Sequence, residues 1–227
     1  MKINLPLLAG QIIFLFLVFA LLLFLPAGTI VWPAAWTFLA LFFVFVIAIT
    51  LWLYQSNPGL LRERMKVSSP DQKAVDRVLF LMLQVGVVAW LILMPLDAVR
   101  FHWSQAPLVV QGVGTILLLC SFSLFFITFR ENPYLSPLIR IQQERGQTVV
   151  SSGPYHYVRH PMYAGALLWL IGTPLLLGSW YGVLWALLLV ALMGRRAVVE
   201  EHTLRAELQG YDSYMSEVKY RLVPYVW

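Results

Sequence analysis

The sequence predicts an all-α integral membrane protein with about six transmembrane helices. Of its 227 residues 60% are hydrophobic and only 12% are charged, which is more apolar surface than a globule of this size can bury. Several apolar stretches are long enough to cross a hydrocarbon core of roughly 30 Å. The composition excludes a soluble cytoplasmic enzyme and a disordered chain, and the lone Cys120 excludes an internal disulfide framework.

Four spans are uninterrupted, and a fifth apolar stretch is divided. The first stretch is predicted to be a span and not a cleaved signal peptide, because it is longer than the usual signal and lacks a small-x-small cleavage site. The last stretch, 164–193, is too long for one crossing and is broken by Pro174 and Gly178, which predicts two short helices folded as a hairpin. The predicted helices are 7–25, 32–54, 78–94, 108–129, 163–177 and 181–194.

The basic residues set the predicted orientation. With six spans, all of the 16 basic residues except Arg100 fall on one side of the membrane. The positive-inside rule makes that side cytoplasmic and places both termini there. Five spans would leave the basic tail outside, which the rule disfavours. The net charge of +5 therefore reflects topology, and no nucleic-acid partner is expected.

We expect a single domain, 1–227, in which 1–129 supply four spans and 130–227 carry the chemistry. The loop 55–77 is interpreted as a solvated segment facing the lipid headgroups, with a helix beginning at Ser69-Pro70-Asp71. Gly112-Val113-Gly114 lies inside a span, so it is predicted to be a helix-packing notch and not a phosphate loop.

The segment 130–163 concentrates polar, aromatic and turn-forming residues beside the membrane. Pro154 and Pro161 bracket the run GPYHYVRHPMY and prevent a continuous helix, so the segment is expected to form a shaped loop. By composition alone, a juxtamembrane anchor and a binding site are equally consistent with it.

The tail provides a second group of residues. Arg196 and Glu200 are four residues apart, which places both on one face of a helix, and Glu201 lies beside them. They could form an ordinary surface ion pair, but acids near membrane depth usually mark a function. An apolar stripe follows and predicts one amphipathic cytoplasmic helix that lies on the membrane or on the preceding loop. Its members are Leu204, Leu208, Tyr211, Tyr214, Val218 and Leu222.

Several common sites have no counterpart in the sequence. No HExxH or Cys/His pattern predicts a metal site, and we expect none. Walker, Rossmann and nucleophile-elbow motifs are also missing.

These motifs together resemble the isoprenylcysteine carboxyl methyltransferase family and the related phospholipid N-methyltransferases. The resemblance rests on GPYHYVRHPMYAG at 153–165, Arg-x-x-x-Glu-Glu at 196–201, Gly-Tyr-x-x-Tyr at 210–214 and a Pro-aromatic ending, and it covers about 140–227. Gln147 departs from the family pattern, where a histidine is common. Gln142 aligns only with a length change, with Gln143 as its rival.

The resemblance implies S-adenosylmethionine as methyl donor and S-adenosylhomocysteine as product. It implies catalytic roles for Arg196 and Glu200, with Arg196 holding the acceptor and Glu200 also binding the donor. It further implies a lipophilic acceptor, as in isoprenylcysteine carboxyl O-methylation, and a multi-pass protein of a bacterial inner membrane whose active site faces the cytoplasm. The remaining implied donor-binding residues are Gln142, Gln147, Thr148, Val149, Val150, Tyr155, His160, Pro161, Met162 and Tyr163.

Three alternatives stay open. The acceptor could be a phospholipid amine or another small molecule methylated on nitrogen, sulfur or oxygen. The chain could be a non-catalytic membrane scaffold with the same fold. It could also be a membrane reductase of related architecture that uses a reduced nicotinamide, although no phosphate-binding cluster distinctive of one is present.

Overall fold

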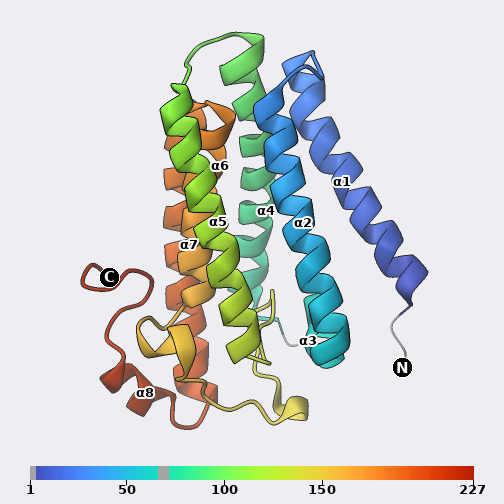
Figure 1. The fold of residues 1–227 in the computed structure, drawn as a ribbon. Coiled ribbons are helices and arrows are strands. Elements are labelled where there is room, and N and C mark those ends of the chain that lie inside the picture. Colours follow the sequence, from blue (N-terminus) through green and yellow to red (C-terminus); the bar gives the residue numbers. More distant parts are fainter. Residues whose placement is uncertain (1–3, 66–71) are drawn as a thin grey trace.

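The computed structural model describes residues 4–65 and 72–227, and the helix start predicted at Ser69-Pro70-Asp71 lies outside them. Within these residues the chain is helical, with long helices running side by side and short elements gathered at one end (Figure 1). The helices are α1 (Leu5–Ala27), α2 (Pro33–Ser56), α3 (Pro58–Arg64), α4 (Ala74–Pro95), α5 (Leu108–Glu131), α6 (Pro161–Leu177), α7 (Trp180–Glu207) and α8 (Tyr211–Glu217). A π-helical turn (Leu96–Arg100) continues α4, and 3-10 turns occur at Gln143–Arg145 and Gly153–His156.

Each predicted span corresponds to a helix, and the all-helical fold class is confirmed. Five helices are long and apolar enough to cross a membrane, whereas α6 has only 17 residues. At 1.5 Å per residue α6 is about 26 Å long, close to a hydrocarbon core of about 30 Å. Six crossings therefore stay a prediction. Large apolar side chains point outward on the long helices, as expected for surfaces that face lipid.

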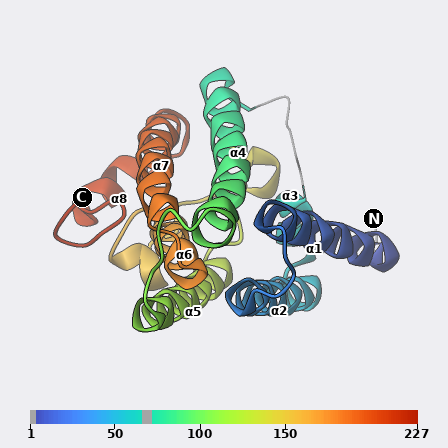
Figure 2. The same cartoon turned by 90° about the horizontal axis from the view of Figure 1, so that it is seen from above.

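The predicted hairpin of α6 and α7 is confirmed. Gly178 ends α6 with φ of 83°, a left-handed conformation that favours glycine, and the Ser179 side chain accepts a hydrogen bond from the Gly182 amide to begin α7. Viewed from above, α6 lies inside the bundle, and it contacts α2, α4, α5 and α7 (Figure 2). A helix packed on several sides can hold site residues rigidly at its end.

The helix-packing notch predicted at Gly112-Val113-Gly114 is confirmed at Gly114 but not at Gly112. A Cβ on Gly114 would lie 2.4 Å from the Leu176 backbone nitrogen and 2.7 Å from the Gly172 carbonyl oxygen, so α5 and α6 meet there backbone to backbone. Gly112 faces open space instead. This close approach lies near the beginning of α5 and the end of α6, at the opposite end of both helices from the polar loop.

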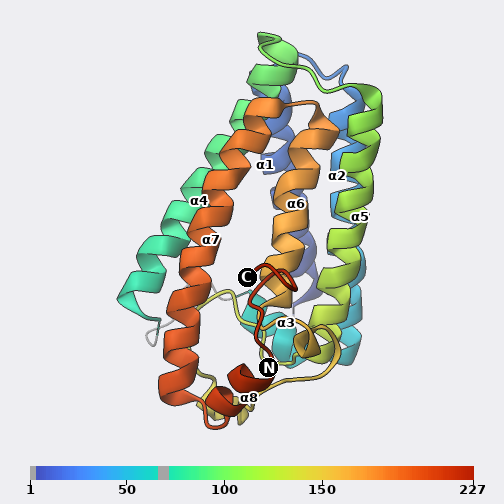
Figure 3. The same cartoon turned by 90° about the vertical axis from the view of Figure 1, so that its left-hand side faces the viewer.

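The prediction of one amphipathic helix along the whole apolar stripe of the tail is wrong in its extent. Helix α7 runs on to Glu207, the chain turns at Gly210 with φ of 85°, and α8 has only seven residues. This turn lets the apolar stripe fold back onto Tyr155 and its neighbours instead of lying along one helix face. After α8 the chain pairs with the loop before α6, through the Arg159 and His160 amides donating to the Tyr220 and Arg221 carbonyls (Figure 3).

Candidate functional site

A cavity of about 910 Å³, its mouth included, opens at the end of the bundle that carries α3 and α8. Its walls come from the loop between α5 and α6, the beginning of α6, the last turns of α7, and α8. Elements far apart in the sequence thus form one site. All but two of the residues predicted for the site line it: Gln147, Thr148, Val149, Val150, Tyr155, His160, Met162, Tyr163, Arg196 and Glu200.

Gln142 and Pro161 are the two predicted residues that do not line the cavity. The Gln142 amide is fully buried, donates to the Tyr134 carbonyl and accepts from Arg145, so its polar atoms hold the loop together. Pro161 is buried at the first position of α6, where its ring suits the start of a helix. Both shape the loop, and a direct contact with the donor stays a prediction for each of them.

Several contacts tie the loop to the bundle. Asn132 donates to the Tyr155 hydroxyl at 2.7 Å, which joins the end of α5 to the Gly153–His156 turn. Arg140 donates to Glu63 of α3 at 2.9 Å, and both side chains are buried. The loop 55–77, interpreted from sequence as solvated, therefore has a buried acid in contact with the site, and that interpretation is corrected for its described residues.

The four-residue spacing of Arg196 and Glu200 would permit a direct ion pair, but in the structure the two side chains are joined through Tyr163. The Tyr163 hydroxyl donates to Glu200 Oε2 at 2.7 Å and accepts from Arg196 Nη1 at 3.1 Å. Arg196 lies between the rings of Phe80 and Tyr163, 5.4 and 6.0 Å from their centroids. A cation and a partly exposed carboxylate thus reach one cavity from successive turns of α7.

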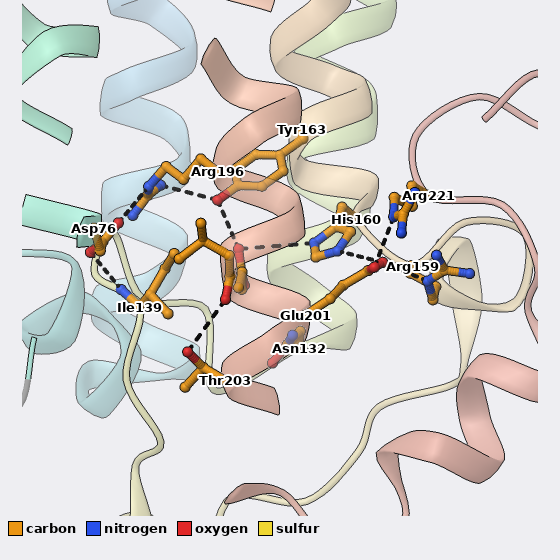
Figure 4. A network of polar contacts seen from close by, with 12 residues as sticks. Asp76, Asn132, Ile139, Arg159, His160, Tyr163, Arg196, Glu201, Thr203 and Arg221 are labelled. Atoms are coloured by element: carbon orange, nitrogen blue, oxygen red, sulfur yellow. Dashed lines mark hydrogen bonds and ion pairs between the residues drawn. The ribbon is translucent and has the colours of Figure 1, made fainter. Parts of the chain in front are cut away.

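Asp76, which the sequence reasoning missed, holds Arg196. Its side chain is fully buried; Oδ1 accepts from Arg196 Nε at 2.7 Å and Oδ2 accepts from the Ile139 amide at 3.0 Å (Figure 4). Arg196 Nη2 also donates to the Pro137 carbonyl, so both interactions fasten the cavity loop to α4 and α7. The signal that could have found Asp76 is an acid directly before an apolar span, the criterion that drew attention to Glu200.

Glu201 points away from Glu200 into a buried ionic cluster. It accepts from Arg159 at 2.7 Å, from His160 at 3.2 Å and from Arg221 at 2.8 Å (Figure 4). The His160 ring also stacks on Tyr163, with centroids 5.4 Å apart. The cluster binds the tail to the loop and fixes the His160 ring beside the cavity.

The other side of the cavity is aromatic and apolar. Tyr155, Leu208, Tyr211, Tyr214 and Val218 form a buried cluster there. The Tyr214 hydroxyl donates to the Tyr155 carbonyl at 2.7 Å. Burial raises the pKa of the Tyr155, Tyr211 and Tyr214 phenols, so these groups stay neutral near pH 7. The cavity is therefore lined by a neutral aromatic cluster that includes α8 as well as by the charged Arg196 and Glu200.

Comparison with known proteins supports the resemblance found in the motifs. Residues 110–209 match the sequence profile of the family described as phospholipid methyltransferase. The protein-S-isoprenylcysteine O-methyltransferase of Schizosaccharomyces pombe is 32% identical over 85 residues, which are 37% of this chain and 36% of that protein. An Arabidopsis thaliana protein of the same name, form B, is 33% identical over 69 residues, 30% of this chain and 35% of that protein. The chain thus spans little more than a third of the length of these relatives.

A second class of relatives covers more of the chain. The mouse Delta(14)-sterol reductase is 30% identical over 167 residues, which are 64% of this chain and 38% of that protein. This match bears on the reductase alternative that the sequence left open.

A solved structure shares the fold. The eukaryotic intramembrane Ras methyltransferase, an isoprenylcysteine carboxyl methyltransferase, matches with a TM-score of 0.50 at 19% identity, over 92% of this chain and 73% of that one. Together with its apolar helices, this identifies the chain as an integral, multi-pass membrane protein with the fold of that methyltransferase. The predicted resemblance to the family is confirmed.

Proposed function

We propose that this protein is a membrane methyltransferase that uses S-adenosylmethionine to methylate a lipophilic acceptor, most like isoprenylcysteine carboxyl O-methylation. The observation that carries the proposal is the chain Glu200–Tyr163–Arg196, which presents a carboxylate and a guanidinium to one cavity. A carboxylate suits a donor that carries cationic groups, and a guanidinium suits an anionic acceptor. The methyltransferase relatives support this assignment.

The residues present fit such a donor. Glu200 accepts one hydrogen bond from a neutral phenol and is 31% exposed, which leaves carboxylate lone pairs for a cationic ligand. Tyr155 lines the same cavity, and aromatic rings attract cations. When bound, the donor supplies a methyl group already activated by its sulfonium, so the chain needs no metal or nucleophile of its own for this reaction.

The chain's own contribution is alignment and exclusion of water. Asp76, Tyr163 and the Pro137 carbonyl occupy three of the five Arg196 N–H donors. The other two have no partner among the described residues, and we assign them to the acceptor's anionic group. Phe80 on α4 covers one face of the guanidinium, so an apolar acceptor arriving between helices would meet Arg196 at the membrane boundary.

Orientation is part of the proposal. The segments rich in basic residues lie at the end of the bundle that carries the cavity, while Arg100 lies against Gly28 at the other end. We infer that the cavity faces the cytoplasm. A reporter fused after Trp227 should read as cytoplasmic, and an external signal would overturn the orientation.

The test of function is donor binding followed by an acceptor screen. Calorimetry of the purified protein with S-adenosylhomocysteine should show binding, and labelled donor should transfer its methyl group to at least one prenylated acid or phospholipid amine. Arg196→Ala should lose turnover on an acidic acceptor and keep most of its donor affinity. A folded protein that shows no binding at millimolar ligand would contradict the methyltransferase assignment.

The sterol reductase relatives favour a second candidate, a reductase that uses a reduced nicotinamide. The same calorimetry with NADPH separates the two. Binding of NADPH without binding of S-adenosylhomocysteine would favour the reductase. If neither ligand binds, the scaffold alternative gains support.

A further inference from the structure

Two tyrosines of α8, Tyr211 and Tyr214, occupy almost equivalent positions at the aromatic end of the cavity. Each is 5% exposed, both line the cavity, and their ring centroids lie 5.7 Å apart. Both rings belong to the same buried cluster, and the two residues differ in the hydrogen bonds of their hydroxyl groups.

The two hydroxyls differ in their hydrogen bonds. The Tyr214 hydroxyl donates to the Tyr155 carbonyl at 2.7 Å. The Tyr211 hydroxyl is buried and has no hydrogen-bond partner in the described part of the chain. Buried hydroxyls are nearly always paired, because an unpaired one loses its bonds to water without replacement. An exception on the wall of a ligand-sized cavity points to a partner that the ligand brings.

The surroundings of Tyr211 indicate which part of a ligand would supply the missing hydrogen-bond partner. Val149, Leu204, Leu208 and Tyr155 give the surroundings of Tyr211 an apolar and aromatic lining, whereas the charged Arg196 and Glu200 line the same cavity outside this cluster. A ligand that is flat and uncharged at one end and charged at the other matches this division. In a nucleoside donor the flat end is the purine, whose ring nitrogens accept hydrogen bonds.

We propose that Tyr211 is a donor-binding residue, and that its hydroxyl donates a hydrogen bond to a purine nitrogen of the nucleoside at the aromatic end of the cavity. The inference rests on the proposed function and adds to it the direction in which the donor lies. The hydroxyl is closed off from water, so donor entry must shift the ring slightly. Tyr211 is the first residue of the short α8, directly after the turn at Gly210.

The proposal predicts that Tyr211→Phe raises the melting temperature of the protein and lowers its affinity for S-adenosylhomocysteine. Tyr211→Phe removes the unpaired hydroxyl, so the ligand-free protein should have a higher melting temperature in detergent. The same variant loses the bond to the purine, so its affinity for S-adenosylhomocysteine should fall about three- to tenfold. A hydroxyl with a purely structural role would lower the melting temperature and leave the affinity of the folded protein unchanged.

Tyr214→Phe is the matched control for stability. It leaves the Tyr155 carbonyl without its donor, so the ligand-free protein should have a lower melting temperature. If Tyr211→Phe also lowers the melting temperature, or leaves the affinity unchanged, the proposal is overturned.

A truncated ligand tests the assigned end. Against 5′-methylthioadenosine, which keeps the nucleoside and lacks the amino-acid group, Tyr211→Phe should lose the same factor in affinity as against S-adenosylhomocysteine. Full affinity for 5′-methylthioadenosine in the variant would place Tyr211 at the amino-acid end and overturn the proposal. Failure of the wild-type protein to bind either ligand would instead contradict the proposed function, so the two failures are distinguishable.

Discussion

Two buried aspartates, at opposite ends of the segment Ala74–Arg100, serve different purposes. Asp76 and Asp97 are both fully buried, and each accepts three hydrogen bonds. Asp76 pairs with the charged Arg196 and with the cavity loop. Asp97 binds the neutral hydroxyls of Ser104 and Ser179 and one backbone amide, and its Oδ1 has no partner among the described residues.

This difference distinguishes the end of the bundle that carries the cavity from the end that carries the α6–α7 turn. At the far end, Asp97 fastens the α6–α7 turn to the chain after α4, which is a local structural lock. At the site end, an ion pair fixes the direction of the Arg196 guanidinium, which lines the cavity. Buried carboxylates of equal exposure can therefore have unequal functions, and the partner decides which.

The largest expected effect comes from Asp76→Asn. The change leaves the buried Arg196 without its counter-ion and places an amide NH2 against either the Ile139 N–H or the Arg196 Nε–H, so the free energy of unfolding should fall by about 3–5 kcal/mol. Surviving folded protein should turn over an acidic acceptor more slowly, because Arg196 loses its fixed direction. Thermal unfolding in detergent and steady-state kinetics on the best acceptor of the screen measure the two effects.

Asp97→Asn is the control at the far end. It weakens bonds to neutral groups and strands no cation, so the loss should be about 1–3 kcal/mol. The donor affinity and the KM for acceptor should stay at wild-type values. Equal kinetic effects of Asp76→Asn and Asp97→Asn would erase the proposed difference between the two ends.

Glu200→Ala tests the charged end of the cavity. Loss of a carboxylate that pairs with a cationic donor should weaken S-adenosylhomocysteine binding about 10- to 100-fold, corresponding to a charge-assisted bond. Calorimetry measures it. Glu217→Ala, which removes an exposed acid of α8, is the matched control and should bind like wild type. Unchanged affinity in Glu200→Ala would remove the carboxylate from the donor site.

Gly114→Ala tests the contact between α5 and α6, toward the far end. A Cβ there meets the α6 backbone at 2.4 Å, so overpacking should cost about 1–3 kcal/mol of unfolding free energy. Gly112→Ala on the same helix faces open space and should be neutral or slightly stabilising. Donor affinity in both folded variants should match wild type. A specific loss of donor binding in Gly114→Ala would show that this contact also controls the cavity.

The smallest effect is expected for Arg205→Ala. Arg205 pairs with Asp212 at 2.7 Å across the turn at Gly210, but both side chains are more than half exposed. Solvent and salt screen such a pair, so thermal unfolding should change by less than about 1 kcal/mol. A larger loss would mean that the turn into α8 depends on this pair, and that charge matters at the site end beyond the buried groups.

The helices were predictable because their signal is local. Apolar stretches, the breaker Gly178 and the glycine at position 114 indicate spans, a hairpin and a close helix contact without knowledge of distant residues, whereas Pro174, also expected to break the chain, lies inside α6. Most residues expected in the site were implied by the resemblance to a methyltransferase family, and the fold brings these segments, which are far apart in the sequence, to one cavity.

The sequence did not show which contacts the polar side chains make. The Gln142 amide bonds within its own loop, to Tyr134 and Arg145, and its contact with the donor stays a prediction. Arg196 and Glu200 had the spacing of an ion pair, but Asp76 competes for the guanidinium from a residue 120 positions away. Spacing along a helix says which groups share a face, and it does not say what packs against that face.

The sequence by itself determined that the chain is a helical membrane protein with segregated basic residues. It also determined that the polar motifs resemble those of membrane methyltransferases, because hydropathy, breakers and short motifs are local properties. Only the tertiary structure decided that Asp76 holds Arg196 and that Tyr163 joins Arg196 to Glu200. It also decided that the Tyr211 hydroxyl, unlike that of Tyr214, has no hydrogen-bond partner among the described residues. Each of these depends on which groups burial brings together, since a buried polar group takes its energy, and therefore its role, from the partner that replaces water.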